Sequence, residues 1–149
     1  MSFGKLSLKG RALKYLAARE HSRLELQRKL QPHEEDAGQL DALLDELEAA
    51  GWLSATRFVE SVLHRKAARF GTARLRHELQ GHGLPQETVA DAVSRLQASE
   101  LERARAVWQR KFGTPAPDAA ARARQMRFLA SRGFSAEVVR RVVQGGDED

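Results

Sequence analysis

The sequence predicts an all-α protein made of three tandem three-helix repeats. Composition is the first observation: apolar residues make up 42% of the 149 residues, aromatic residues only 6%, and there are four prolines. Leu and Ala dominate the apolar set, which is typical of helical proteins and not of sandwiches or barrels. The second observation is an internal repeat, and the third is a set of helix-start and helix-end signals at matching positions.

The first helix of each repeat identifies the repeat. The segments "RALKYLAAR", "RFVESVLHR" and "RARAVWQRK" begin at residues 11, 57 and 103, so they recur every 46 residues. Each segment places apolar residues at helical spacing on one face. Later positions align at offsets of 49 and then 50, as Leu30, Leu79 and Leu129 illustrate. Because loops absorb insertions and helices do not, the drift places the extra residues in the connections between helices.

Nine helices follow from this pattern, three in each repeat. They are expected at residues 9–20, 22–31, 37–50, 54–69, 71–82, 85–98, 100–112, 118–131 and 135–144. The expected repeats span residues 1–53, 54–99 and 100–145, and an acidic tail occupies residues 146–149.

Several expected helix starts carry a residue that suits the first turn. Ser22 and Glu25 form the S-x-x-E pattern of a capping box. Pro85 suits the first turn of a helix, where its missing N–H costs nothing. The expected N-caps with short polar side chains are Ser22, Ser54, Asp118 and Ser135.

Three expected helix ends share the pattern Leu-x-x-x-Gly-apolar, in "LEAAGW", "LQGHGL" and "LASRGF". A glycine with a left-handed backbone, followed by an apolar residue that packs back on the helix, forms a Schellman ending. We therefore expect Gly51, Gly83 and Gly133 to have positive φ angles. The side chains expected to be largely buried are Trp52, at the joint between the first two repeats, Phe58, Leu79, Trp108 and Leu129.

Several classes of function are excluded by what the sequence lacks. There is no cysteine, which excludes disulfides, thiolate catalysis and cysteine-based zinc sites and fits a reducing cytoplasm. No membrane span is expected, since no stretch approaches about 18 consecutive apolar residues. No nucleotide-binding or hydrolase motif is present. His33 precedes three acidic residues, but such acids ahead of a helix favour its N-terminal dipole. We expect no enzyme activity, cofactor, metal or small-molecule substrate.

The charge of the chain points to an anionic partner. Net charge is +5 and the pI is about 10.1. Residues 1–54 carry a net charge of −1, residues 55–99 carry +3, and residues 100–149 carry +3 despite the acidic tail. A mild basic excess of this kind suggests a polyanion or an acidic protein as partner. The acidic residues of the first repeat would repel nucleic acid and would suit a basic protein surface or solubility.

A basic stripe recurs on the first helix of each repeat, beginning at Arg11, Arg57 and Arg103 and ending eight residues later. Two explanations are open: the stripes line up to contact a periodic polymer, or each arginine stem covers the same apolar edge of its repeat. The candidate binding residues are Arg19, Arg57, Arg65, Arg69 and Lys111, with Arg74 and Arg76 on the neighbouring helix as second choices.

These segments resemble the RecX family of bacterial regulatory proteins. The matching elements are "ALKYLAAREHSRLELQRKL" (12–30), "GWLSATRFVESVLHRKAARFGTARLRHELQGHGL" (51–84) and "RQMRFLASRGFS" (124–135), in family order and spacing. The resemblance implies three-helix repeats in an elongated, curved array. It also implies a cytoplasmic protein that is not an enzyme and that acts in recombination, DNA repair and the SOS response.

The partner that the resemblance implies is the RecA recombinase. Family members usually act on the RecA filament on single-stranded DNA and lower its ATP hydrolysis and strand exchange. A monomer is expected, and contact with single-stranded DNA is an open possibility. The alternative from the residues is a helix-turn-helix-like protein that binds DNA directly, although no helix starts with the Asn, Gln and Arg of a recognition helix. A third alternative is a protein scaffold without DNA contact.

Overall fold

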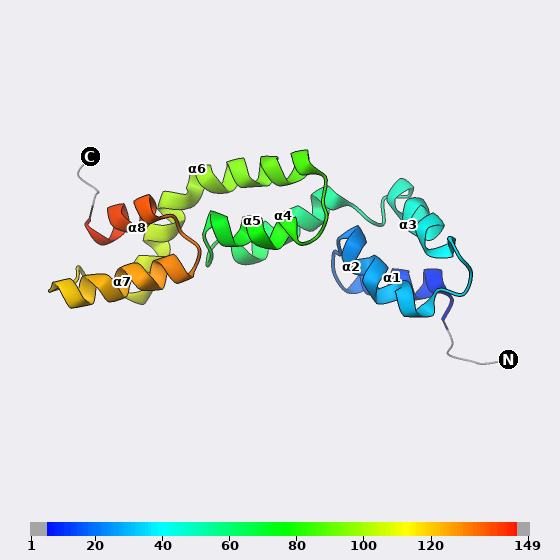
Figure 1. The fold of residues 1–149 in the computed structure, drawn as a ribbon, viewed down its shortest axis with the longest axis horizontal. Helices are drawn as coiled ribbons and strands as arrows, with labels where there is room; N and C mark the ends of the chain where they lie inside the picture. The colour runs from blue at the N-terminus through cyan, green and yellow to red at the C-terminus, as the bar shows by residue number, and fades with distance from the viewer. Residues whose placement is uncertain (1–5, 146–149) are drawn as a thin grey trace.

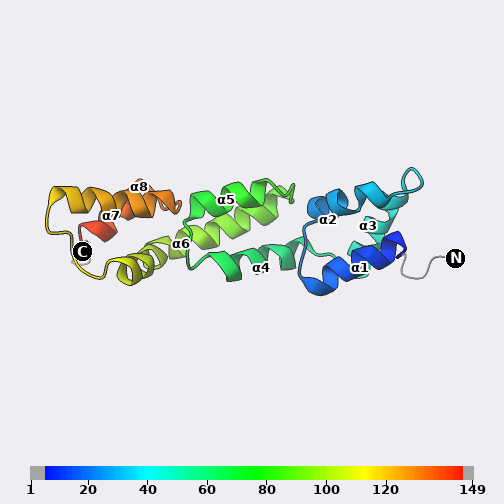
Figure 2. The same cartoon turned by 90° about the horizontal axis from the view of Figure 1, so that it is seen from below.

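The computed structural model describes residues 6–145 as an elongated all-α molecule, with α1 to α3 at one end and α7 and α8 at the other (Figures 1 and 2). Eight α-helices and one 3₁₀ helix occur within these residues, and no strand does. The helices are α1 Leu8–Ala18, α2 Arg23–Leu30, η1 Gln31–His33, α3 Gln39–Ala49, α4 Ala55–Lys66, α5 Thr72–Gln80, α6 Gln86–Lys111, α7 Ala119–Ser131 and α8 Ala136–Val143. The expected acidic tail lies outside the described residues.

The helices form three groups, each around its own core. The first group, α1 to α3, buries a leucine-rich cluster that includes Leu26, Leu30 and Leu44. The second group, α4, α5 and the first half of α6, buries Phe58, Val59, Val62, Leu79 and Ala92, with Phe70, Leu75 and Leu96 beside them. The third group, the second half of α6 with α7 and α8, buries Ala104, Val107, Leu129, Phe134, Val139, Val142 and Val143. Three small cores explain why the molecule is long.

The prediction of nine helices is wrong at one place. The helices expected at 85–98 and 100–112 are one continuous helix of 26 residues, α6. The intervening "ASE" contains neither glycine nor proline, so nothing in the backbone ends the helix there. The second and third groups therefore share a helix, and the repeat boundary expected at residue 99 stays a prediction.

The predicted N-caps are confirmed. Ser22 Oγ accepts from the backbone N–H of Glu25 at 3.1 Å, and Ser54 Oγ accepts from that of Arg57 at 3.1 Å. The Asp118 carboxylate and the Ser135 hydroxyl each accept from the backbone N–H three residues further along the chain, at 2.8 Å and 3.2 Å respectively. Each bond satisfies one of the free N–H groups at a helix start.

The Schellman ending of α3 forms in the backbone, but its tryptophan does not pack as expected. Gly51 has φ 85° and the Trp52 N–H reaches the Leu47 carbonyl at 2.9 Å. Leu53, however, is the side chain that enters the first core, and the Trp52 side chain is 54% exposed. The burial predicted for Trp52 is thus wrong, because the next residue along the chain takes the apolar position. Trp108 is partly buried, while Phe58, Leu79 and Leu129 are buried as predicted.

The exposure of Trp52 leads to a stability prediction. Trp52→Ala should lower the free energy of unfolding by less than about 1 kcal/mol, since exposed side chains contribute little. Phe58→Ala, in the second core, should lower it by about 3–5 kcal/mol. Urea unfolding measures both changes. A loss above about 2 kcal/mol for Trp52→Ala would show that this ring packs against the fold.

Candidate nucleic-acid interface

Three arginines surround the ring of Phe70, which lies between α4 and α5. The guanidinium of Arg74, on α5, is 4.2 Å from the ring centre, and that of Arg69 is 5.1 Å away. Arg132, which follows α7 in the third group, is 5.9 Å away. At these distances the cations are attracted by the ring, and the charged groups keep a defined place on the surface.

A second ring extends this arrangement into the third group. Phe128, on α7, has Arg132 at 4.8 Å and Lys111 at 5.2 Å from its centre. Phe112 meets Phe128 edge-on, with ring centres 5.6 Å apart. Arg132 therefore lies over both rings and joins the two groups of cations. We call Arg69, Arg74, Lys111 and Arg132, with Phe70 and Phe128, the arginine–aromatic surface.

This surface suits contact with a polyanion. Four cations drawn from three segments far apart in the chain lie around two rings. Cations on a backbone-tracking surface neutralise phosphates, and the two rings, of which Phe70 is buried, attract those cations through cation–π contacts. Three of the four, Arg69, Arg74 and Lys111, were predicted from the sequence. Arg132 was not, because it stands outside every stripe.

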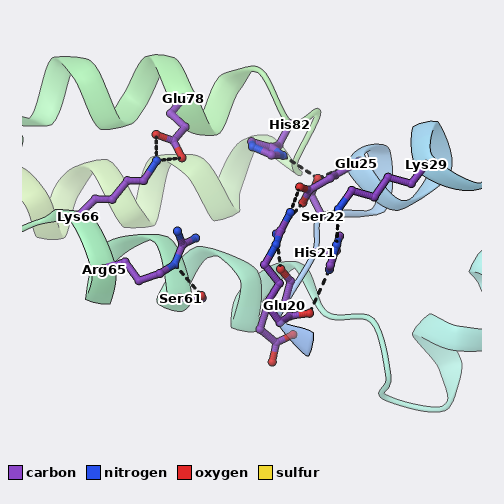
Figure 3. Close-up of polar contacts among 11 residues, drawn as sticks. Glu20, His21, Ser22, Glu25, Lys29, Ser61, Arg65, Lys66, Glu78 and His82 are labelled. Atoms are coloured by element: carbon purple, nitrogen blue, oxygen red, sulfur yellow. Dashed lines mark hydrogen bonds and ion pairs between the residues drawn. The ribbon is translucent and has the colours of Figure 1, made fainter. Parts of the chain in front are cut away.

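Two further predicted residues lie on the second group but outside this surface. Arg65 is exposed on α4, and its Nε donates to Ser61 Oγ at 3.4 Å, as Figure 3 shows. Arg76 is half-buried on α5 and lines a small hollow with Gln97 and Glu100. The structure thus brings together three of the seven predicted site residues.

The remaining two predicted residues, Arg19 and Arg57, have acidic partners near the joint between the first and second groups. Arg19 follows the last residue of α1 and pairs with Glu25. Burial raises the pKa of the Glu25 carboxyl, but the hydrogen bond and charge of Arg19, together with the charges of His21 and Lys29, lower it overall. Arg57 Nε pairs with Glu20 at 3.0 Å, and Arg57 Nη2 donates to the Gly51 carbonyl at 2.7 Å.

Arg57 and Arg103, which occupy aligned stripe positions, each donate to backbone carbonyls in a connection of the preceding helix group. Arg57 binds the Gly51 carbonyl, and Arg103 Nη1 binds the carbonyls of Ala67 and Phe70. These contacts give the 46-residue register a packing reason. Charge reversal at Arg57 would therefore test the joint as well as binding.

The joint between the first and second groups rests on a few polar contacts. Ser22 Oγ and His82 Nδ1 are hydrogen-bonded at 2.7 Å across 60 residues of chain, as drawn in Figure 3. The His82 ring packs on Phe58, with centres 4.6 Å apart.

His21, buried to 1% exposure, has a partner for each ring nitrogen. Nδ1 lies 3.0 Å from the Arg19 carbonyl, to which it donates, and Nε2 accepts from Lys29 Nζ at 2.9 Å (Figure 3). Burial lowers the pKa of His21, and the nearby positive charges of Arg19 and Lys29 add to this; the Arg19 carbonyl and Glu25 oppose it. The neutral ring is the form that fits.

This arrangement predicts a pH dependence of stability. The lowered pKa of folded His21 means that the unfolded chain binds the proton first, at about pH 6.5. The free energy of unfolding should therefore fall as the pH drops below about 6.5. His21→Gln should flatten that fall in thermal unfolding scans, and His33→Gln, which removes an exposed ring, serves as the control. An unchanged slope in His21→Gln would show that His21 is not the group responsible.

Some acidic residues of the first group form ion pairs with basic residues of the same group. Arg23 bridges Asp45, at 2.8 Å, and Glu48, and Lys9 pairs with Glu46 at 2.6 Å. Within residues 6–145, no group of three or more His, Asp or Glu side chains is arranged to hold a metal ion. In the same part of the chain, no helix has the length and apolar content that crossing a membrane requires.

Comparison with known proteins adds sequence relatives. The model of the third three-helix domain of RecX matches residues 98–143. Regulatory protein RecX of Leptothrix cholodnii is 58% identical over 144 residues, covering 97% of this chain and 92% of the relative. Regulatory protein RecX of Ralstonia nicotianae is 57% identical over 142 residues, covering 95% of this chain and 89% of the relative.

Solved structures with the same fold are also known. The crystal structure of RecX from Lactobacillus salivarius superposes with a TM-score of 0.78 at 16% identity and covers 95% of this chain and 96% of that one. A second crystal structure, of a regulatory protein RecX, has a TM-score of 0.72 at 17% identity, covering 92% of this chain and 70% of that one. At these identities the likeness is one of fold.

Proposed function

Because this chain belongs to the RecX family of regulatory proteins, which are not enzymes, we propose that it binds the RecA recombinase and its filament on single-stranded DNA. In this proposal it inhibits ATP hydrolysis and strand exchange, and it works as a cytoplasmic monomer. The family membership, at 58% identity over nearly the whole chain, supports the choice of partner.

The observation that carries the proposed site is the arginine–aromatic surface. It gathers four cations from two helix groups, whereas the exposed acidic residues of α3 would repel a phosphate backbone. We propose this surface as the main contact with filament or DNA. Arg65 and Arg76 extend it along the second group, and Arg19 and Arg57 contribute from the first joint.

The elongated shape suits a partner that is itself a polymer. Three helix groups in a row can touch several repeating units of a filament, and each further contact gains effective concentration from the previous one. Modest individual contacts then suffice for tight binding. A small compact domain with the same residues would reach fewer units.

The direct test is the rate of RecA ATP hydrolysis on single-stranded DNA with the protein added. We expect the rate to fall as the protein is titrated. A salt titration of DNA binding separates this proposal from a helix-turn-helix-like DNA-binding protein. Loss of affinity with salt and no sequence preference support backbone contact, while strong preference for one duplex sequence would favour the alternative.

A further inference from the structure

A buried carboxylate lies in the middle of α6, where the second and third groups meet. Glu100 is only 6% exposed. Its Oε2 accepts from the backbone N–H of Ser135 at 2.8 Å, and its Oε1 accepts from that of Thr72 at 3.4 Å. Thr72 begins α5 and Ser135 caps α8, so one side chain satisfies N–H groups at two helix starts.

Arg103, one turn further along α6, binds the second group at the same joint. All three nitrogens of its guanidinium donate, at distances between 2.5 Å and 3.2 Å. The acceptors are the carbonyl oxygens of Ala67, Phe70 and Leu96 and the hydroxyls of Thr72 and Ser99. Burial lowers the pKa of Arg103, and the charge of Glu100 opposes that shift.

These contacts end at the residues that build the arginine–aromatic surface. Phe70, which Arg103 binds through its carbonyl, carries one of the two rings. The Gly71 N–H donates to the Arg132 carbonyl at 2.7 Å, so the backbone of the second group touches that of the third directly beside the cations. Arg74 Nη1 also reaches the Ser131 carbonyl at 3.5 Å.

We infer that Glu100 is a positioning residue for the arginine–aromatic surface: by binding the starts of α5 and α8 together, it holds the cations of the second and third groups in one arrangement. This inference rests on the proposed function, because it concerns the same surface. The surface is then composite, since Arg69 and Arg74 come from one side of the joint and Arg132 from the other. Loosening the joint should weaken polyanion binding even when every surface cation is present.

Glu100→Gln tests this without changing the size of the side chain. The two backbone N–H groups each need an acceptor, but glutamine has only one acceptor oxygen. Its NH₂ group would face the second N–H, and both are donors. The substitution also makes the chain more positive, so electrostatics alone would tighten polyanion binding. Glu102→Gln, an exposed position two residues along the same helix, makes the identical charge change and is the control.

Two measurements on the full chain are compared: amide hydrogen exchange at Thr72 and Ser135, and binding to a fluorescent oligo(dT) followed by anisotropy. For Glu100→Gln we expect exchange at both amides to accelerate by about tenfold or more. The dissociation constant should rise several-fold. Glu102→Gln should leave exchange unchanged and bind at least as tightly as the wild type.

Arg103→Lys provides a second variant in case Glu100→Gln fails to fold. It keeps the net charge, but an ammonium cannot make the same set of contacts, so weaker binding would again reflect position and not charge. The inference would be overturned if either variant folded, showed a loosened joint by hydrogen exchange, and still bound oligo(dT) with wild-type affinity. The proposed function fails separately, if charge reversal at Arg69 and Lys111 leaves binding intact.

Discussion

Replacing Gly71 with alanine is expected to push the start of α5 away from the α7–α8 connection and to destabilise the chain by about 3 kcal/mol, at the upper end of overpacking effects. Gly71 has an ordinary extended backbone, with φ −79°, so the reason is space. A Cβ at this position would overlap the Gly133 carbonyl group and the Phe134 nitrogen. These are backbone atoms, which no side-chain rotation can move away. The Gly71 hydrogen bond to Arg132 would be lost as the chains move apart.

Gly81→Ala is the matched control for this prediction. Gly81 follows the other end of the same helix, α5, and a Cβ there would meet the Glu78 carbonyl oxygen at an ordinary 3.4 Å. Denaturant unfolding should show a stability change of less than about 1 kcal/mol for it. If Gly71→Ala were as stable as Gly81→Ala, the close contact between the second and third groups would not exist in solution.

Reversing two charges of the arginine–aromatic surface is expected to weaken binding to RecA filaments on single-stranded DNA by roughly 30-fold, or about 2 kcal/mol. The variant is Arg69→Glu with Lys111→Glu, both exposed. Each change replaces attraction to an anionic group by repulsion. Each also loses a cation–π contact of about 0.5–1 kcal/mol, so the chain should stay folded. Fluorescence anisotropy with labelled filaments measures the affinity.

Lys14→Glu with Arg28→Glu is the control pair. It makes the same change of net charge at two exposed positions of the first helix group. We expect its affinity to stay within a few-fold of the wild type. The difference in affinity between the two double variants should shrink as salt is added, because the Arg69→Glu/Lys111→Glu variant has fewer charge contacts left for salt to screen. Equal loss in both pairs would mean that net charge governs binding and the surface does not.

Local signals in the sequence predict much of the fold. The caps at Ser22, Ser54 and Ser135 depend on residues three apart, and the left-handed Gly51 on its immediate neighbours. Such interactions are complete within one turn, so the sequence alone carries them. Trp52 shows the limit, because whether residue 52 or Leu53 enters the core depends on how α3 packs in three dimensions.

The site was predicted less completely than the fold, for a physical reason. Helical spacing identifies which basic residues share a face, and it led to Arg69 and Lys111, while Arg74 was a second choice on the neighbouring helix. It says nothing about contacts between groups, such as Arg132 over the Phe70 ring, 62 positions away in the sequence. Glu100 was likewise unremarkable in the sequence, since only the approach of α8 to α5 gives its carboxylate two partners.

Inhibition of RecA ATP hydrolysis on single-stranded DNA is the measurement that tests the central claim most directly. The wild type, the Arg69→Glu/Lys111→Glu pair and the Lys14→Glu/Arg28→Glu pair are titrated into the same reaction. We predict that the wild type and the control pair lower the rate at similar concentrations, and that the surface pair needs roughly 30-fold more protein. If the surface pair stays folded and inhibits as well as the wild type, the arginine–aromatic surface is not the contact with the filament.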